Sequence, residues 1–336
     1  MSAAPAPVPQ TGAPLLSVRG LRTHLRTPRG VLRAVDGVDF ELHAGRTLGI
    51  VGESGSGKSV LARSLMGLNP AAIEVRAGGS VLYAGEDLRN ADERRMRQLR
   101  GREFAMVFQD PMTSLNPVLT LGGQIGQVLR LHLGLSRSAA QARAVELLDS
   151  VGIPSPRERI DQYPHELSGG QRQRVMIALA LSCNPRLLLA DEPTTALDVT
   201  VQKQILALLQ RAQRERDMAL VLITHDLGVV ADVADDIAVM YAGRIVERAP
   251  AASLFAAPRM RYTEALLACA PALDSVPHAP LAAVPGRPPD LTQPLPGCAF
   301  APRCRHADAQ CHAQAPPLTG GTHAFACWHP AQESRA

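Results

Sequence analysis

The stretch that decides the fold is residues 47–59, which read TLGIVGESGSGKS. Its first part, 47–51, is mostly apolar and is followed by a glycine, which is typical of a strand buried on both faces of a parallel sheet. The rest fits the phosphate-binding loop pattern GxxxxGK[ST], and a helix is expected directly after it, over 60–67. The residues of this loop are Gly52, Glu53, Ser54, Gly55, Ser56, Gly57, Lys58 and Ser59.

The chemistry of this loop is that of a phosphate cradle. Its glycines let backbone N–H groups turn toward phosphate oxygens, and the following helix adds the positive end of its dipole. Lys58 can reach the β- and γ-phosphates, and the Ser59 hydroxyl can ligate Mg²⁺. The chain has 35 Lys and Arg residues, and reading the sequence finds Lys58 and Lys203 as the lysines. Because lysine is rare in this chain, its presence here favours a specific role for the compact ammonium group over a chance Lys-Ser pair.

Two acidic residues end a second apolar strand, expected over 187–190. Asp191 at the strand tip can hold Mg²⁺ through water, and Glu192 can polarise an attacking water as general base. A buried strand followed by a charged turn is common by itself, so this interpretation depends on the phosphate loop.

A third motif, LSGGQ at 167–171, precedes an apolar helix expected over 172–181. Ser168 is placed to cap that helix, and the glycines leave its N-terminus open to an anion. Viewed alone, the motif is equally well a capped helix start. His225 follows what we expect to be the last buried strand, 219–224. If that strand is parallel to the one at 47–51, both end at the same sheet edge.

The order of elements indicates an α/β fold. Residues 120–182 lack strand signals, and strand–helix alternation flanks them on both sides, so a helical insertion is expected at about 110–182. Short strands are expected over 15–18 and 35–42, separated by a turn at 27–30. We divide the chain into a disordered leader (1–13), a nucleotide-binding domain (14–250) and a C-terminal extension (251–336).

Composition excludes several classes of protein. Of the 336 residues, 46% are hydrophobic and 20% charged, so the chain is not mainly disordered. The net charge of +4 argues against a nucleic-acid partner. No apolar run reaches the about 18 residues of a membrane span, and no signal peptide is recognised at the N-terminus.

The motifs in their order resemble those of the nucleotide-binding subunit of ABC transporters over about 14–250. They are the phosphate loop, Gln109, LSGGQ, the Asp191-Glu192 pair, ALD at 196–198 and His225. The resemblance implies a RecA-like P-loop ATPase core with a small antiparallel β subdomain. It also implies two subunits clamped face to face, with ATP between the loop of one and Ser168, Gly169, Gly170 and Gln171 of the other.

The resemblance also assigns roles to single residues. Gln109 senses Mg²⁺ and the water and couples to the membrane partner, Asp198 lines the dimer seam, and His225 contacts the γ-phosphate. The family usually stacks adenine on an aromatic residue before its second strand. Here Leu25, beside His24, stands at that position, so we expect apolar contact from Leu25 or Val31 instead.

Several short sequence motifs narrow the resemblance to the ATPase subunits of peptide and nickel importers, with the D-type subunit of dipeptide/oligopeptide systems nearest. It rests on YPHE at 163–166, DEPTTALDVTVQ at 191–202, THDLG at 224–228 and the tail motifs at 285–291 and 297–304. Such a subunit lies peripherally at the cytoplasmic face of the membrane. Its implied partners are a second ABC ATPase in a heterodimer, two permease subunits and an extracytoplasmic substrate-binding protein.

Alternatives to peptide import remain open. The same resemblance admits a nickel or other small-solute importer. A soluble ABC ATPase of DNA repair or translation is less favoured, because the chain has one cassette, no heptad run and little net charge. A P-loop kinase leaves LSGGQ without explanation.

Four cysteines gather near the C-terminus with the spacing C-x5-C-x6-C-x15-C: Cys298, Cys304, Cys311 and Cys327. Four converging thiolates suit zinc or an iron–sulfur cluster, and spacing alone places zinc first. Reduced thiols in a packed appendage are the plain alternative. The resemblance implies a 4Fe–4S cluster on these four cysteines, with Zn²⁺ as the alternative and Trp328 beside them. Cys183 and Cys269 are expected to be ordinary small hydrophobes.

Overall fold

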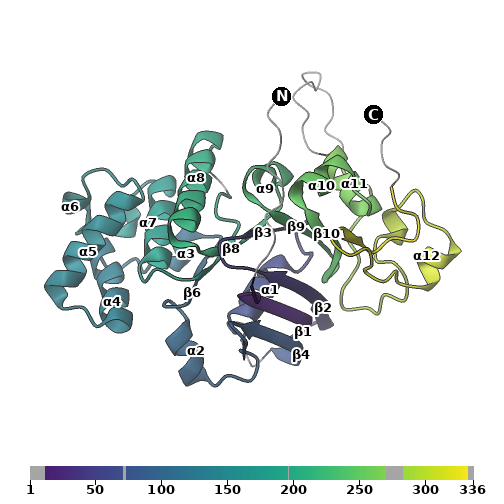
Figure 1. Ribbon diagram of the computed structural model, residues 1–336, viewed down its shortest axis with the longest axis horizontal. Coiled ribbons are helices and arrows are strands. Elements are labelled where there is room, and N and C mark those ends of the chain that lie inside the picture. Colours follow the sequence, from purple (N-terminus) through teal and green to yellow (C-terminus); the bar gives the residue numbers. More distant parts are fainter. Residues whose placement is uncertain (1–11, 71–72, 196, 270–282, 332–336) are drawn as a thin grey trace.

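A computed structural model describes residues 12–70, 73–195, 197–269 and 283–331. Residues 1–11 of the expected leader, and Ala196 of the ALD motif, lie outside the described residues. Figure 1 shows a central sheet with a helical part on one side, a small antiparallel sheet below, and the C-terminal segment on the other side.

The described strands and helices are as follows. The strands are β1 Leu16–Thr27, β2 Gly30–Leu42, β3 Thr47–Val51, β4 Glu74–Tyr83, β5 Glu86–Asp87, β6 Phe104–Val107, β7 Leu187–Asp191, β8 Ala219–Thr224, β9 Asp236–Tyr241, β10 Arg244–Pro250 and β11 Ala324–Phe325. The α-helices are α1 Lys58–Leu65, α2 Glu93–Leu99, α3 Pro111–Ser114, α4 Leu121–Leu133, α5 Arg137–Ser150, α6 Pro156–Arg159, α7 Gly169–Leu181, α8 Val199–Arg216, α9 Leu227–Val233, α10 Ala251–Ala256, α11 Arg261–Ala268 and α12 Ala309–Ala313. Two 3₁₀ turns are η1 Pro164–Glu166 and η2 Ala301–Arg303.

The central sheet has the strand order β11-β10-β9-β3-β8-β7-β6. Strands β9, β3, β8, β7 and β6 run parallel, and β10 and β11 are antiparallel to them. The carboxyl ends of β3, β7 and β8 therefore meet at one sheet edge, as expected for the phosphate loop, the acidic pair and His225. The expectation that β8 is the last buried strand is wrong. The apolar run at 237–241 carries the signal of β9, which inserts beside β3.

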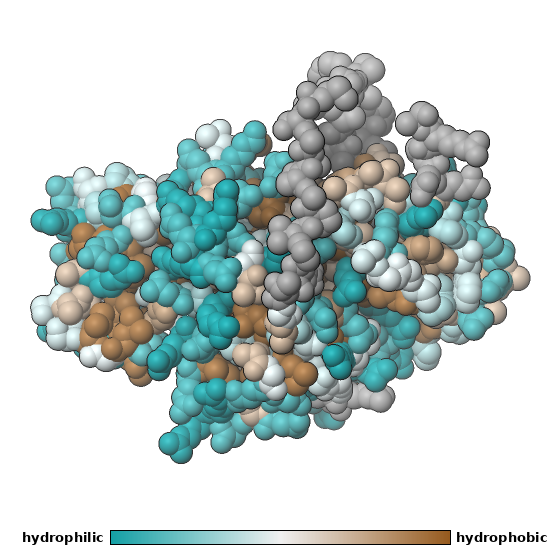
Figure 2. All heavy atoms as spheres, viewed as in Figure 1, coloured by the Kyte–Doolittle hydropathy of each residue, from teal (hydrophilic) through white to brown (hydrophobic). Residues whose placement is uncertain are grey.

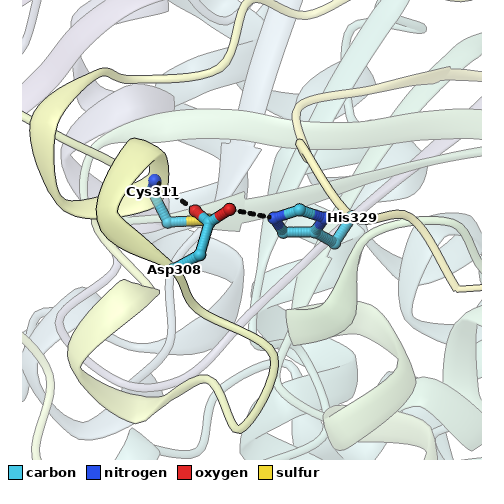
Figure 3. A group of neighbouring side chains, drawn as sticks. All are labelled: Asp308, Cys311 and His329. Atoms are coloured by element: carbon cyan, nitrogen blue, oxygen red, sulfur yellow. Dashed lines mark hydrogen bonds and ion pairs between the residues drawn. The ribbon is translucent and has the colours of Figure 1, made fainter.

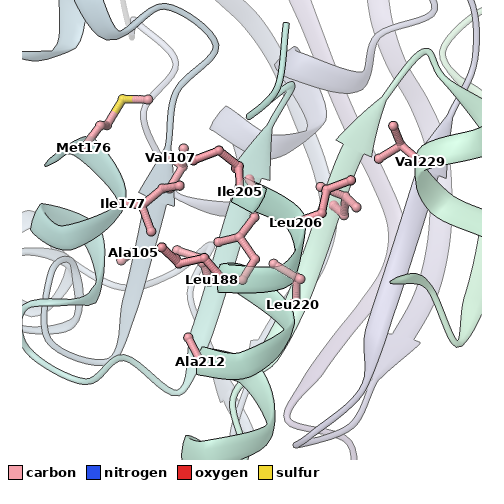
Figure 4. Close-up of a cluster of buried hydrophobic side chains, with 14 of the residues drawn as sticks. Ala105, Val107, Met176, Ile177, Leu188, Ile205, Leu206, Ala212, Leu220 and Val229 are labelled. Atoms are coloured by element: carbon pink, nitrogen blue, oxygen red, sulfur yellow. The ribbon is translucent and has the colours of Figure 1, made fainter. Parts of the chain in front are cut away.

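Alternating side chains of the central strands enter two separate cores. Leu188 and Leu220 belong to the core shared with the helical part, whereas Leu187 and Val221 face the antiparallel sheet and α1. Figure 4 shows the first of these cores, where β6, β7 and β8 pack against α7 and α8. Both faces of the strands are covered, which explains their unbroken apolar character.

The antiparallel sheet has the order β2-β1-β4-β5. Its hairpin turns where predicted, and Thr27 Oγ1 donates to the Gly30 carbonyl oxygen over 2.8 Å. Both strands are longer than the predicted 15–18 and 35–42. Register shifts interrupt the β1–β2 pairing, so the apolar–polar alternation is lost where the strands continue.

The helical insertion spans α3 to α7, between β6 and β7. Helix α8 follows the acidic pair and has Asp198 as its N-cap. Helix α2 is capped by Asp92, whose side chain accepts from the Arg95 N–H. None of the helices in the described part of the chain is long and apolar enough to cross a membrane.

The C-terminal segment joins the same sheet and core. Strand β11 pairs with β10, and Tyr262 of α11 and Phe300 belong to the core of the helical side. The segment after residue 250 is therefore in direct contact with the nucleotide-binding part of the chain.

Candidate functional site

The phosphate loop lies between β3 and α1, and the helix begins at Lys58, two residues before the predicted start. Gly52 and Gly57 both have positive φ, at 155° and 104°. A Cβ at Gly52 would meet the Met240 carbonyl of β9, and one at Gly57 the Ala34 carbonyl of β2. Close backbone approach from both sheets thus requires glycine at these two positions.

The side chain of Lys58 folds back onto the phosphate loop. Its side chain is buried, and Nζ donates to the carbonyl oxygens of Gly52 (2.7 Å) and Glu53 (3.0 Å). Burial lowers the pKa of Lys58, while the nearby carboxylates Glu192 and Asp191 oppose this shift. The ammonium is therefore held at the loop, near the carboxylates of Glu192 and Asp191.

Ser59 and Asp191 bring a hydroxyl and a carboxylate together from α1 and the end of β7. Ser59 Oγ donates to Asp191 Oδ1 over 3.1 Å, although the residues are 132 positions apart. Burial raises the pKa of Asp191, and the Ser59 hydrogen bond partly offsets the shift. Hydroxyl and carboxylate oxygens at this spacing fit the hard-oxygen preference of Mg²⁺.

Glu192 is held from three directions. Gln109 Nε2 donates to Oε2 over 3.0 Å, Thr195 Oγ1 donates to the same oxygen over 2.8 Å, and His225 Nδ1 lies 3.3 Å from Oε1. Its φ of 48° is the left-handed region, an uncommon conformation for a residue with a side chain. Sequence reasoning predicted Gln109 and His225 here but missed Thr195, three positions after the acid it binds.

The LSGGQ segment forms an exposed helix start. Ser168 caps α7 as predicted: the Gln171 N–H donates to Ser168 Oγ over 3.3 Å, and the Ser168 N–H donates to Gln171 Oε1 over 3.0 Å. In Figure 1, α7 and α1 lie well apart. Among the described residues, no hydrogen bond or ion pair links this segment to the phosphate loop.

The β1–β2 hairpin carries the residues expected at the adenine. His24 is buried, and its Nε2 lies 3.1 Å from Asp36 Oδ1. Leu25 is half-buried and pairs with Leu32, while Val31 is 42% exposed. Of the candidates, Val31 therefore offers the most accessible apolar surface.

The four tail cysteines belong to one small unit. The Cys298 N–H donates to the Cys311 carbonyl over 2.7 Å, and η2 connects Cys298 to Cys304. Burial raises the thiol pKa of Cys298, Cys311 and Cys327, and neighbouring cysteines of the set add to each shift.

The spacing of possible ligand atoms tests whether the tail fits a single metal ion. In the described chain, ligand atoms of three or more His, Cys, Asp or Glu residues come within 4.8 Å of one another only at Asp308, Cys311 and His329. Figure 3 shows this group, in which His329 Nε2 lies 2.9 Å from Asp308 Oδ2. A single tetrahedral zinc with bonds of about 2.3 Å needs sulfurs about 3.8 Å apart. Among the described residues, the four cysteines do not form a group within this distance of one another.

Comparison with known proteins gives consistent matches along the chain. The family model "ABC transporter" matches residues 35–195, and the model "Oligopeptide/dipeptide transporter, C-terminal region" matches residues 246–311. The oligopeptide transport ATP-binding protein OppD of Bacillus subtilis (strain 168) is 51% identical over 320 residues, which cover 94% of this chain and 89% of that protein. A putative peptide import ATP-binding protein of Brucella abortus (strain 2308), BAB2_1052, is 53% identical over 311 residues, or 92% and 93% of the two chains.

Solved structures agree with the fold. The dimeric ATP-binding cassette MJ0796, described in a post-hydrolysis state bound to ADP and Pi, aligns with a TM-score of 0.63 and 26% identity. The alignment covers 70% of this chain and 98% of that one. The remaining part of this chain has no counterpart there.

Proposed function

This chain belongs to the ABC transporter family, and we propose that it is the ATP-hydrolysing subunit of an importer of di- or oligopeptides. The observation that carries the proposal is the meeting of Lys58, Ser59, Asp191 and Glu192 at one sheet edge. The peptide substrate class rests on the matched C-terminal region and on the named relatives.

The residues divide the work of hydrolysis between binding and proton transfer. Lys58 and the loop N–H groups bind the β- and γ-phosphates of ATP. Ser59 and Asp191, joined by Gln109, would hold Mg²⁺, which when bound neutralises charge on the phosphates. Glu192 accepts the proton of the attacking water, and the products are ADP and phosphate. Gln109, Thr195 and His225 orient the Glu192 carboxylate.

We propose that ATP closes a dimer with a second ABC ATPase, as a heterodimer. Support comes from the exposed N-terminus of α7, where Ser168, Gly169 and Gly170 offer an anion site that the chain's own phosphate loop does not use. Asp198, the N-cap of α8, is proposed to line the seam.

Two permease subunits and an extracytoplasmic binding protein complete the proposed system, with this chain at the cytoplasmic face of the membrane. Exposed apolar side chains in the segment 108–118, which includes Gln109, support a docking role: Phe108 is 36% exposed, Met112 60% and Val118 77%. Figure 2 shows hydrophobic atoms also gathered on the surface of the helical part. An apolar surface of this kind is typical of a protein-binding site.

For the tail we retain the division after residue 250 and propose that Cys298, Cys304, Cys311 and Cys327 bind a 4Fe–4S cluster, with Zn²⁺ as the alternative. Cys298, Cys304 and Cys327 pack at the edge of the main core, which supports a buried centre. A cluster would stabilise a segment too small for a core of its own.

Uptake by cells tests the substrate class. A strain lacking this chain receives the wild-type gene, the Lys58→Ala variant or the matched Lys203→Ala variant. Labelled di- and oligopeptides and nickel are supplied in parallel. We expect peptide uptake with wild type and Lys203→Ala but not with Lys58→Ala. Nickel uptake with the same pattern, and no peptide uptake, would replace the proposal by its alternative.

A further inference from the structure

Glu53, the second residue of the phosphate loop, is bound from the C-terminal segment. Its N–H donates to Tyr262 Oη over 2.8 Å. Its two carboxylate oxygens accept from Arg303 Nη1 and Nη2 over 2.6 and 2.9 Å. The partners are 209 and 250 positions away along the chain. Glu53 is thus hydrogen-bonded to the C-terminal segment twice: its backbone N–H donates, and its carboxylate accepts.

Arg303 is fixed on every side. Besides Glu53, its guanidinium donates to Tyr241 Oη and to the carbonyls of Val284 and Pro285 over 3.2, 3.1 and 2.7 Å. These bonds use the full donor set of the fork, and only 3% of the side chain is exposed. An arginine held in this way presents two N–H donors and its positive charge to Glu53 in one fixed orientation.

Tyr262 is equally well anchored. Its side chain is fully buried, and its ring packs against Tyr241 and Phe300 with centroids 4.4 and 5.4 Å apart. The phenol oxygen accepts the Glu53 N–H, so this donor points to the tyrosine. Meanwhile the Glu53 carbonyl accepts from Lys58 over 3.0 Å. The orientation of the peptide units around Glu53 is therefore set jointly by α11 and Lys58.

The charge of Glu53 makes this arrangement relevant to ATP. A carboxylate in a loop that binds a triphosphate repels the ligand, and the repulsion grows with the number of phosphate charges. The bidentate arginine neutralises this charge. Removing the arginine from this partly buried pair leaves the Glu53 carboxylate uncompensated.

We propose that Arg303 and Tyr262 are positioning residues through which the C-terminal segment sets the ATP affinity of the phosphate loop. The proposal rests on the proposed ATP binding at this loop. It concerns neither the cysteine centre nor hydrolysis itself, and it predicts a nucleotide-charge dependence that simple packing of the segment does not.

The test measures ATP and ADP dissociation constants of the full chain by calorimetry. Arg303→Gln should weaken ATP binding about tenfold and ADP binding less, because ADP carries less charge. Arg305→Gln is the control, because Arg305 is exposed, follows in the same segment and hydrogen-bonds His306. It should bind like wild type. Equal losses for both nucleotides, or no loss, would overturn the proposal.

Removing the unpaired carboxylate supplies the decisive second measurement. Arg303→Gln combined with Glu53→Gln should recover most of the lost ATP affinity, and Arg303→Lys should lose less than Arg303→Gln. A double variant as weak as the single one contradicts charge compensation. If Arg303→Gln does not fold, Tyr262→Phe removes one hydroxyl and should still weaken ATP binding several-fold. An unchanged ATP affinity in Tyr262→Phe would contradict the proposal. A wild-type chain that binds no ATP refutes the proposed function instead.

Discussion

The Gln109 side-chain amide donates to Glu192 Oε2 over 3.0 Å, although the two residues are 83 positions apart. Gln109 follows β6 and Glu192 follows β7, and these strands are parallel neighbours in the sheet. Their carboxyl ends meet at one edge of the sheet, so the amide and the acid come together although they belong to different sequence motifs. Any change that turns the Glu192 carboxylate should therefore act on hydrolysis before it acts on ATP binding.

Glu192→Gln should abolish most turnover while ATP still binds. The amide cannot accept a proton from water, and loss of a general base lowers the rate by about 100-fold or more. Phosphate release and calorimetry measure the two properties, and size-exclusion chromatography with the partner subunit detects trapped closed dimers. Glu215→Gln, at an exposed position of α8, is the matched control. Unchanged turnover in Glu192→Gln would remove this residue from its assigned role.

Thr195→Val should reduce kcat several-fold and leave KM for ATP nearly unchanged. The substitution keeps the shape of the side chain but removes the hydroxyl that donates to Glu192 Oε2. A misoriented base costs part of its rate contribution. Thr195→Ser restores the donor and should return kcat toward wild type. Equal losses in Thr195→Val and Thr195→Ser would indicate packing rather than orientation of the carboxylate.

Asp191→Asn should raise the unfolding temperature of the metal-free, nucleotide-free chain at pH 7, by about 2 °C. Burial raises the pKa of Asp191 above 3.8, so the folded state binds this proton more tightly than the unfolded state. Holding the charged carboxylate thus costs stability at neutral pH, and the cost vanishes as pH falls through the folded pKa toward 3.8.

Scanning calorimetry at several pH values checks the direction of this effect on the unfolding temperature. The advantage of Asp191→Asn over wild type should shrink on acidification, and Mg²⁺-ATP should stabilise wild type but not the variant. Asp161→Asn, an exposed substitution in the helical part, is the control. An advantage that grows as pH falls contradicts the argument.

The tail metal is decided by elemental analysis. Anaerobically purified chain should contain iron and acid-labile sulfide in about equal amounts. Cys311→Ser should lose both, whereas Cys269→Ser, outside the set of four, should retain them. Chelation should selectively lower the stability of the C-terminal segment, because it lacks a large core of its own. Zinc without sulfide would establish the alternative, and neither metal would leave reduced thiols.

Local chemistry determined a large part of this protein from sequence. Glycines at Gly52 and Gly57, the Ser168 cap and the buried strand before the loop all follow from propensities within a few residues. The acidic pair was recognised for the same reason, since a strand and its last residues are contiguous. These features needed no knowledge of which strands are neighbours.

Tertiary structure decided what depends on strand order and on contacts distant in sequence. Only the packed sheet places β9 beside β3, and only its edge brings Gln109 onto the Glu192 carboxylate. The pairing of Arg303 with Glu53 spans 250 positions and leaves no periodic trace, because each residue alone is an ordinary charge. Propensity acts over a few residues, whereas the phosphate loop takes part of its geometry from a segment that folds back from the end of the chain.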